Sequence, residues 1–137
     1  VHDYPVRLLS DHRQDVLENL IVYRRDLSPD VVFVPSSSDL HQDHQILFAE
    51  AARAFKQTTL WGYELPWNHV TFAAQAFVAL KAVHVERKWQ ALQAYETQLE
   101  LRRPYFTRSF VEGLARVRGT QLGTEFAEAF EVVRIRW

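Results

Sequence analysis

Two histidines three residues apart, His41 and His44, are the residues of this sequence best suited to chemistry. They lie in His41-Gln42-Asp43-His44, where a run of apolar residues at helical spacing begins. Residues i and i+3 share one face of a helix, so both imidazoles are expected on one face of the first turn. Because the chain has no cysteine, metal ligands have to come from His and carboxylate side chains.

The elements on either side place these histidines at the end of a strand. Residues 31–34, Val-Val-Phe-Val, show no polar alternation, which is expected of a strand covered on both faces, and Pro35 ends it. A polar loop over residues 35–40 follows, and Leu47, Ala51 and Phe55 then recur at helical spacing. Ligand sites in open α/β sheets lie at such strand-to-helix junctions.

The rest of the chain alternates predicted helices with predicted strands. A helix capped by Ser10 or Asp11 ends at Ser28-Pro29, and a strand covers residues 58–63. Residues 70–80 fit either a strand or a helix. Three later elements are expected: a helix over about residues 83–102, a shorter helix ending at Gly119, and a strand over residues 130–137.

Composition narrows the class of protein. With 137 residues, 47% of them hydrophobic, the chain is expected to form one packed domain over residues 1–137, or part of one. The net charge is −1, and basic and acidic residues are interspersed, so the sequence shows no basic cluster of the kind that binds nucleic acid. No apolar run approaches the roughly 18 residues of a membrane span, and no signal peptide is found. We therefore expect a cytoplasmic protein, and a homo-oligomer stays open.

The segments around the histidines resemble a known enzyme family. Residues 29–35 lead into Asp39-Leu40-His41-Gln42-Asp43-His44, which is similar to the Asp-x-His-x-Asp-His element of the PIG-L/LmbE family of zinc-dependent N-acetylglucosaminyl deacetylases. Weaker agreement is found in four segments: residues 3–7, 63–68, 95–98 and 127–132. The resemblance spans nearly the whole chain. It implies a Rossmann-like α/β fold with a mostly parallel sheet, and removal of an acetyl group from an N-acetylated amino sugar or glycoconjugate.

The resemblance also implies a role for each residue of this element. His44 would bind zinc, His41 would stabilise the tetrahedral oxyanion and protonate the leaving amine, and Asp43 would orient and tune His41. Arg7 and Asp39 are the candidates for substrate binding. These roles agree with general chemistry, because the positive end of a helix favours a neutral imidazole ligand, whereas a nearby carboxylate favours a protonated one.

One element of the family has no counterpart in this sequence. The family's first signature, usually Ala/Pro-His-Pro-Asp-Asp-Glu, supplies a His ligand, an Asp ligand and the general base, and Val1-His2-Asp3 does not match it. We expect on the order of 80–100 further residues upstream in the natural protein. We also expect these 137 residues alone neither to hold zinc tightly nor to hydrolyse N-acetyl sugars.

Each assignment has a structural alternative. The two histidines also fit ordinary hydrogen-bonding residues at a helix start, and Asp39 fits a helix N-cap equally well. Trp61, Tyr63 and Trp67 fit either an aromatic wall against a sugar ring or the core of the sheet. Two other functions stay open: a non-catalytic carbohydrate-binding or assembly module with the same fold, and a zinc amidase acting on a non-sugar N-acyl compound.

Overall fold

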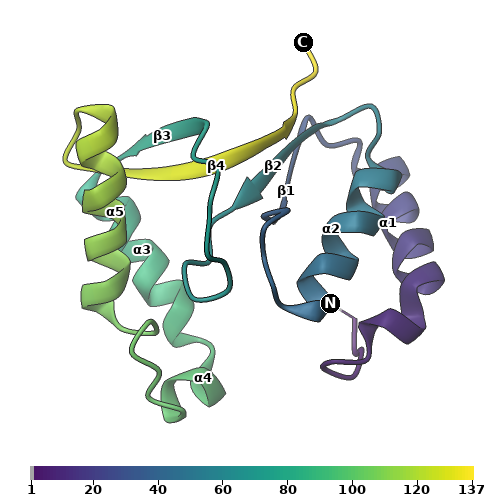
Figure 1. The fold of residues 1–137 in the computed structure, drawn as a ribbon, viewed down its shortest axis with the longest axis horizontal. Coiled ribbons are helices and arrows are strands. Elements are labelled where there is room, and N and C mark those ends of the chain that lie inside the picture. The colour runs from purple at the N-terminus through teal and green to yellow at the C-terminus, as the bar shows by residue number, and fades with distance from the viewer. Residues whose placement is uncertain (1) are drawn as a thin grey trace. The chain divides into compact units, whose positions relative to one another are not determined.

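Helices and strands alternate along the chain, which confirms the expected α/β class (Figure 1). The structure is a computed structural model that describes residues 2–137. Two compact units are found, each with its own core. Unit 1 comprises residues up to Gln75 together with Phe130–Trp137, and unit 2 is Ala76–Ala129. The prediction that the chain is a single domain stays a prediction.

The elements of each unit follow one another in chain order. Unit 1 contains η1 (Leu9–His12), α1 (Arg13–Leu27), β1 (Val31–Pro35), α2 (Gln42–Ala54) and β2 (Thr59–Tyr63). Unit 2 contains β3 (Ala76–Leu80), α3 (Ala82–Gln93), α4 (Glu96–Glu100) and α5 (Arg108–Leu122). The last strand, β4 (Phe126–Arg134), begins in unit 2 and ends in unit 1.

The strands form a four-stranded sheet in the order β1-β2-β4-β3. β1 and β2 are parallel, as expected for a strand, helix and strand in succession, whereas β2 and β4 are antiparallel. The sheet is therefore mixed rather than mostly parallel. Its register aligns Val34 of β1, Gly62 of β2 and Glu131 of β4 side by side, close to the end of β1.

The core of unit 1 lies between the sheet and the helices α1 and α2, which run side by side (Figure 1). Side chains on a strand alternate between faces, so Val34 points into this core and is 3% exposed. Val31 and Phe33 point to the other face and are 41% and 53% exposed. The prediction that this strand is covered on both faces is therefore wrong for the described residues. β1 is an edge strand of the sheet. Phe33 contacts the ring of Trp61 on β2 and the ring of Phe130 on β4.

The predicted helix over residues 83–102 is two helices. α3 ends at Gln93, and α4 begins at Glu96 after Tyr95 has left helical geometry, with φ −89° and ψ 67°. Val85, Trp89 and Leu92 still form the expected apolar stripe and pack in the core of unit 2. No Gly or Pro marks the break, so the sequence carried no local signal for it.

Gly119 lies inside α5 and does not end it. A Cβ at this position would lie 2.6 Å from the Glu125 carbonyl oxygen, so glycine lets the returning chain pass close to the helix. The helix ends at Gly123, whose φ of 78° is left-handed.

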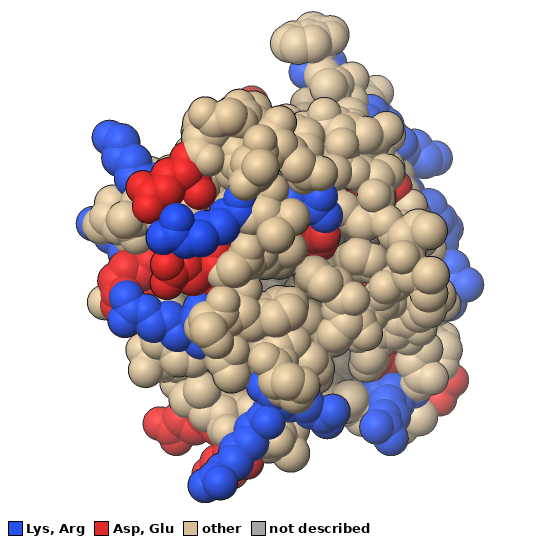
Figure 2. Space-filling view, turned by 60° about the vertical axis from the view of Figure 1, so that its left-hand side comes forward, with Lys and Arg blue, Asp and Glu red and all other residues tan. Residues whose placement is uncertain are grey.

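The remaining predictions of elements are confirmed or refined. α1 ends where expected, but its N-cap residue is His12, and the predicted caps Ser10 and Asp11 lie in η1 instead. β2 lies where expected, the ambiguous residues 70–80 contain β3, and the last strand starts at Phe126 instead of residue 130. In the part of the chain that the structure describes, no helix has the length and apolar character needed to cross a membrane. On the face shown in Figure 2, basic and acidic side chains lie next to one another, as the balanced composition predicts.

Candidate functional site

The two histidines lie at the junction of β1 and α2, with their ring centroids 4.5 Å apart. His41 is the N-cap residue of α2, and its Nδ1 atom accepts a hydrogen bond of 3.2 Å from the backbone N–H of Asp43. His44 lies in the first turn of the helix. The spacing of three residues therefore brings the imidazoles together, as the sequence predicts.

Asp39 contacts both histidines. Its side chain is 1% exposed, and its Oδ1 atom accepts from the backbone N–H of His41 at 2.8 Å. Its Oδ2 atom lies 2.8 Å from Nδ1 of His44. The helix N-cap is His41, so the alternative of Asp39 as the N-cap residue is wrong. A buried carboxylate fixes the orientation of an imidazole in this way behind many metal-binding histidines.

These partners assign opposite tautomers to the two imidazoles. Nδ1 of His41 faces an N–H group, so it carries a lone pair, and the proton of the neutral ring is on Nε2. Nδ1 of His44 faces a carboxylate oxygen, so it donates, and the lone pair is on Nε2. His44 can therefore bind a metal through Nε2, whereas His41 can donate a hydrogen bond through its own Nε2.

Asn68 is a residue of this site that the sequence did not single out. Its Nδ2 atom lies 3.4 Å from Asp39 Oδ2 and 3.4 Å from His44 Nδ1. The Asp39 contact with His44 is shorter by 0.6 Å (3.4 − 2.8), and it therefore decides the tautomer of His44. The backbone carbonyl of Asn68 also accepts from the backbone N–H of Leu40 at 2.7 Å. Asn68 ends the segment over residues 63–68, which resembles the family, but no local pattern in that segment indicates that Asn68 folds back onto the loop before α2.

Asp43 does not contact His41 in the expected way. Its carboxylate accepts from the backbone N–H groups of Arg7 at 2.7 Å and Leu9 at 3.3 Å, and so anchors the turn before η1. The group of Asp43 that orients His41 is its backbone N–H. The predicted tuning of His41 by the Asp43 carboxylate is therefore replaced in the structure by a main-chain contact.

Arg7 is brought to the same helix start by its backbone. Its carbonyl accepts from Gln42 Nε2 at 2.6 Å, and its φ of 70° lies in the left-handed region. That conformation costs a non-glycine residue roughly 1–2 kcal/mol, so the contacts with Gln42 and Asp43 have to maintain it. The Arg7 side chain is exposed. Its role in substrate binding stays a prediction.

The side chains at the junction of β1 and α2 can provide one ligand of a zinc site. A catalytic zinc takes three protein ligands and leaves one position open. Among residues 2–137, no group of three or more His, Cys, Asp or Glu side chains is placed to hold a metal ion. This chain can provide His44 Nε2, with Asp39 as the carboxylate behind it. The junction thus combines one metal ligand with one neighbouring hydrogen-bond donor.

The tryptophans near the junction differ in their exposure. Trp61 packs against Phe33 and Phe130, with ring centroids 6.0 and 5.5 Å away, as expected of residues in the sheet. Trp67, by contrast, is 40% exposed. Trp61 is half-buried in this aromatic cluster on the sheet and is not part of either core, so the choice between an aromatic wall and a core position stays open.

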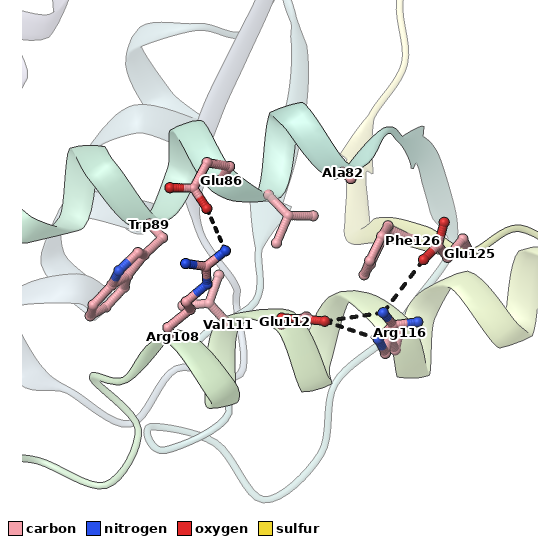
Figure 3. A pocket seen from close by; sticks show the side chains of 10 residues that line it. Ala82, Glu86, Trp89, Arg108, Val111, Glu112, Arg116, Glu125 and Phe126 are labelled. Atoms are coloured by element: carbon pink, nitrogen blue, oxygen red, sulfur yellow. Dashed lines mark hydrogen bonds and ion pairs between the residues drawn. The ribbon is translucent and has the colours of Figure 1, made fainter.

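A separate pocket lies within unit 2, between α3, α5 and the start of β4 (Figure 3). None of the predicted site residues lines it. Its charged side chains pair with one another: Arg108 contacts Glu86 at 2.6 Å, and Arg116 contacts Glu112 at 3.0 Å and Glu125 at 3.4 Å. The Arg116 guanidinium also lies 4.5 Å from the ring centroid of Phe126.

Two solved structures share the fold of this chain. The conserved protein TT1542 from Thermus thermophilus matches 90% of the chain at 23% identity, with a TM-score of 0.71. An N,N'-diacetylchitobiose deacetylase from Pyrococcus horikoshii, solved with its inhibitor MPG, matches 88% at 17% identity, with a TM-score of 0.64. At these identities the matches show a common fold, which is that of a deacetylase in the second case.

The chain spans only part of these proteins. It covers 60% of the Thermus protein and 51% of the Pyrococcus deacetylase. No protein-family model matches the sequence, and no curated protein matches it.

Proposed function

We propose that this chain belongs to a zinc-dependent hydrolase of the PIG-L/LmbE type, which removes the acetyl group from an N-acetylated amino sugar or glycoconjugate. The observation that carries the proposal is the pair of adjacent imidazoles at the junction of β1 and α2. Asp39 holds His44 with Nε2 available, and His41 lies beside it with Nε2 as a donor. The fold shared with a diacetylchitobiose deacetylase supports the class of reaction.

His44 is the zinc ligand in this proposal. Its ring is held in the first turn of α2 with Nδ1 on Asp39, so Nε2 is the nitrogen available to a metal. Asp39 keeps the Nδ1 proton in place, so we propose it as a positioning residue rather than a substrate-binding one. Bound zinc supplies a Lewis acid for the amide carbonyl and lowers the pKa of a bound water.

His41 is the proposed stabiliser of the oxyanion. Attack on an amide carbonyl places negative charge on its oxygen, and a fixed donor at that position lowers the barrier. The Nε2 proton of His41 is such a donor, because Nδ1 is occupied by the backbone N–H of Asp43. Protonating Nδ1 would break that bond. The geometry therefore supports oxyanion stabilisation more directly than proton donation to the leaving amine.

Arg7 is proposed to contact the part of the substrate that does not carry the acetyl group. An exposed guanidinium near the start of α2 can donate several hydrogen bonds to sugar hydroxyls or bind a phosphate. Its backbone contacts with Asp43 and Gln42 keep it close to the two histidines.

The test is release of acetate by the intact protein supplied with zinc. N-acetylglucosamine, N,N'-diacetylchitobiose and a non-sugar N-acetyl amine are compared as substrates, and hydrolysis of the sugars is expected. Turnover of the non-sugar compound alone would establish the amidase instead. Saturable binding of the sugars without acetate release would establish a non-catalytic carbohydrate-binding module.

A matched control is provided by His84. It lies in the first turn of α3, and its Nδ1 accepts from the backbone N–H of Lys81 at 3.1 Å, much as His41 accepts from Asp43. His84→Ala is expected to leave acetate release unchanged, because His84 belongs to unit 2 and lies outside the proposed site.

A further inference from the structure

We propose that Glu131 is a positioning residue for the candidate site, because it fixes the loop that carries Asp39. Its link to zinc rests on the function proposed above, whereas its effect on His44 does not. Glu131 lies on β4, far along the chain from the histidines, and its carboxylate contacts Ser36 and Ser37.

The Glu131 carboxylate binds the first two residues after β1. Its Oε2 atom accepts from Ser36 Oγ at 2.8 Å and from the backbone N–H of Ser37 at 2.7 Å, and its Oε1 atom accepts from Ser37 Oγ. Ser36 is 2% exposed. A carboxylate with three donors on one short loop fixes that loop more firmly than a neutral acceptor would, since charge-assisted hydrogen bonds are the stronger kind.

This contact joins β4 to the loop after β1 by crossing β2, and Gly62 makes it possible. β2 lies between β1 and β4, so the Glu131 side chain has to pass over β2 at the residue paired with it, Gly62. A Cβ on Gly62 would lie 3.0 Å from Glu131 Oε2 and 3.0 Å from Ser36 Cα. Both distances are tighter than ordinary contacts, so a side chain at residue 62 would displace the carboxylate, the loop or both.

A short series of hydrogen bonds leads from Ser36 to the histidines. The Ser36 carbonyl accepts from the backbone N–H of Asp39 at 3.0 Å. The Asp39 carboxylate then holds the His41 N–H and His44 Nδ1. Because Asp39 is buried, it depends on these few partners, and a shift of Ser36 moves the carboxylate that orients His44.

A purely structural role makes a different prediction. If Glu131 only tied β1 to β4, its loss would lower stability and leave the His44 ring as it is. If it positions the loop, the Asp39 contact with His44 weakens as well. The tautomer of His44 and the affinity for zinc are therefore the measurements that separate the two roles.

The experiment compares Glu131→Gln and Gly62→Ala with Glu128→Gln in the intact protein. Glu128 lies on the same strand and pairs with Lys88 in unit 2, so it is the matched control. Glu131→Gln is expected to weaken zinc binding by about tenfold, the lower end for residues behind a metal ligand. Gly62→Ala should act in the same direction, and Glu128→Gln should not. Zinc affinity is measured by chelator competition, and the His44 tautomer by its two ¹⁵N chemical shifts.

Each outcome decides one question. Unchanged zinc affinity and unchanged His44 ¹⁵N shifts in both Glu131→Gln and Gly62→Ala would overturn the proposal, whatever happened to thermal stability. A wild-type protein that binds zinc without releasing acetate would contradict the proposed function alone, and the loss of affinity in Glu131→Gln would still support positioning. If the wild-type protein bound no zinc, a change in the His44 shifts of Glu131→Gln would support positioning, and no change would overturn it.

Discussion

Two clusters of polar side chains in this molecule differ in what their hydrogen bonds leave available. In the pocket of unit 2, the charged residues neutralise one another, as in the pair of Arg108 and Glu86, whose side chains are 62% and 37% exposed. At the junction of β1 and α2, the Asp39 carboxylate is 1% exposed and accepts from His44 Nδ1 and from the backbone N–H of His41, whose own Nδ1 accepts from the backbone N–H of Asp43. The Nε2 atoms are left for a ligand. Polar groups that satisfy each other indicate stability, whereas groups held from one side indicate a site.

The energies of the two clusters differ for the same reason. Exposed ion pairs contribute about 0–1 kcal/mol each, because water solvates the separated charges almost as well. A buried carboxylate that loses its partner costs several kcal/mol, because water does not replace that partner. Substitutions at the junction should therefore have large effects on chemistry, and substitutions in the pocket should have small effects on stability.

The largest effect is expected for His44→Ala. This variant removes the proposed zinc ligand and should lose both bound zinc and acetate release, because Nε2 of His44 carries the lone pair that the hydrogen bonds of this junction leave available to a metal. Zinc content is measured by elemental analysis of the purified protein. Full zinc occupancy in this variant would remove His44 from the metal site.

His41→Ala should separate chemistry from metal binding. Zinc content should stay near normal, while turnover falls roughly 10²–10⁴-fold through loss of the donor to the oxyanion. The two variants are compared at saturating sugar, so that a change in KM is not mistaken for a change in kcat. Equal loss of zinc in both would show that the two histidines do not have distinct roles.

Asp39→Asn should have a smaller effect on zinc. The amide presents a weaker acceptor to His44 Nδ1, and the zinc affinity is expected to fall about 10–100-fold, as for other carboxylates behind a metal-binding histidine. Chelator competition measures it. An unchanged affinity would mean that the Asp39 contact is structural.

The smallest effect is expected in the pocket of unit 2. Glu86→Gln removes the ion pair with Arg108 and should lower the free energy of unfolding by no more than about 1 kcal/mol. Zinc affinity and acetate release should stay as in the wild type. Thermal or urea denaturation gives the first value, and a large loss of activity would show that this pocket is part of the functional site.

Local pattern was sufficient to predict the strand and helix that carry the histidines. The apolar run of β1, Pro35 and the helical spacing after Gln42 fix that junction, and the spacing of His41 and His44 then brings their rings together. The class of fold followed from the alternation of elements. The break at Tyr95 was not predicted, because no Gly or Pro marks it.

The partners of the site residues could not be predicted from the sequence. Asp43 binds the backbone of Arg7, 36 positions away, and Glu131 binds Ser37 across 94 positions. Such contacts depend on which strands become neighbours, and periodicity does not encode that. Burial also depends on which elements pack against a strand. Phe33 is apolar, as buried residues usually are, yet it is half exposed because it lies on an edge strand.

The tautomers of His41 and His44 test the central claim most directly. Long-range ¹H–¹⁵N correlation spectra of the metal-free protein, recorded at a pH where both rings are neutral, report which nitrogen of each ring is protonated. We expect the proton of His44 on Nδ1 and the proton of His41 on Nε2. The same tautomer in both rings, or the reverse assignment, would contradict the division into a metal ligand and a hydrogen-bond donor.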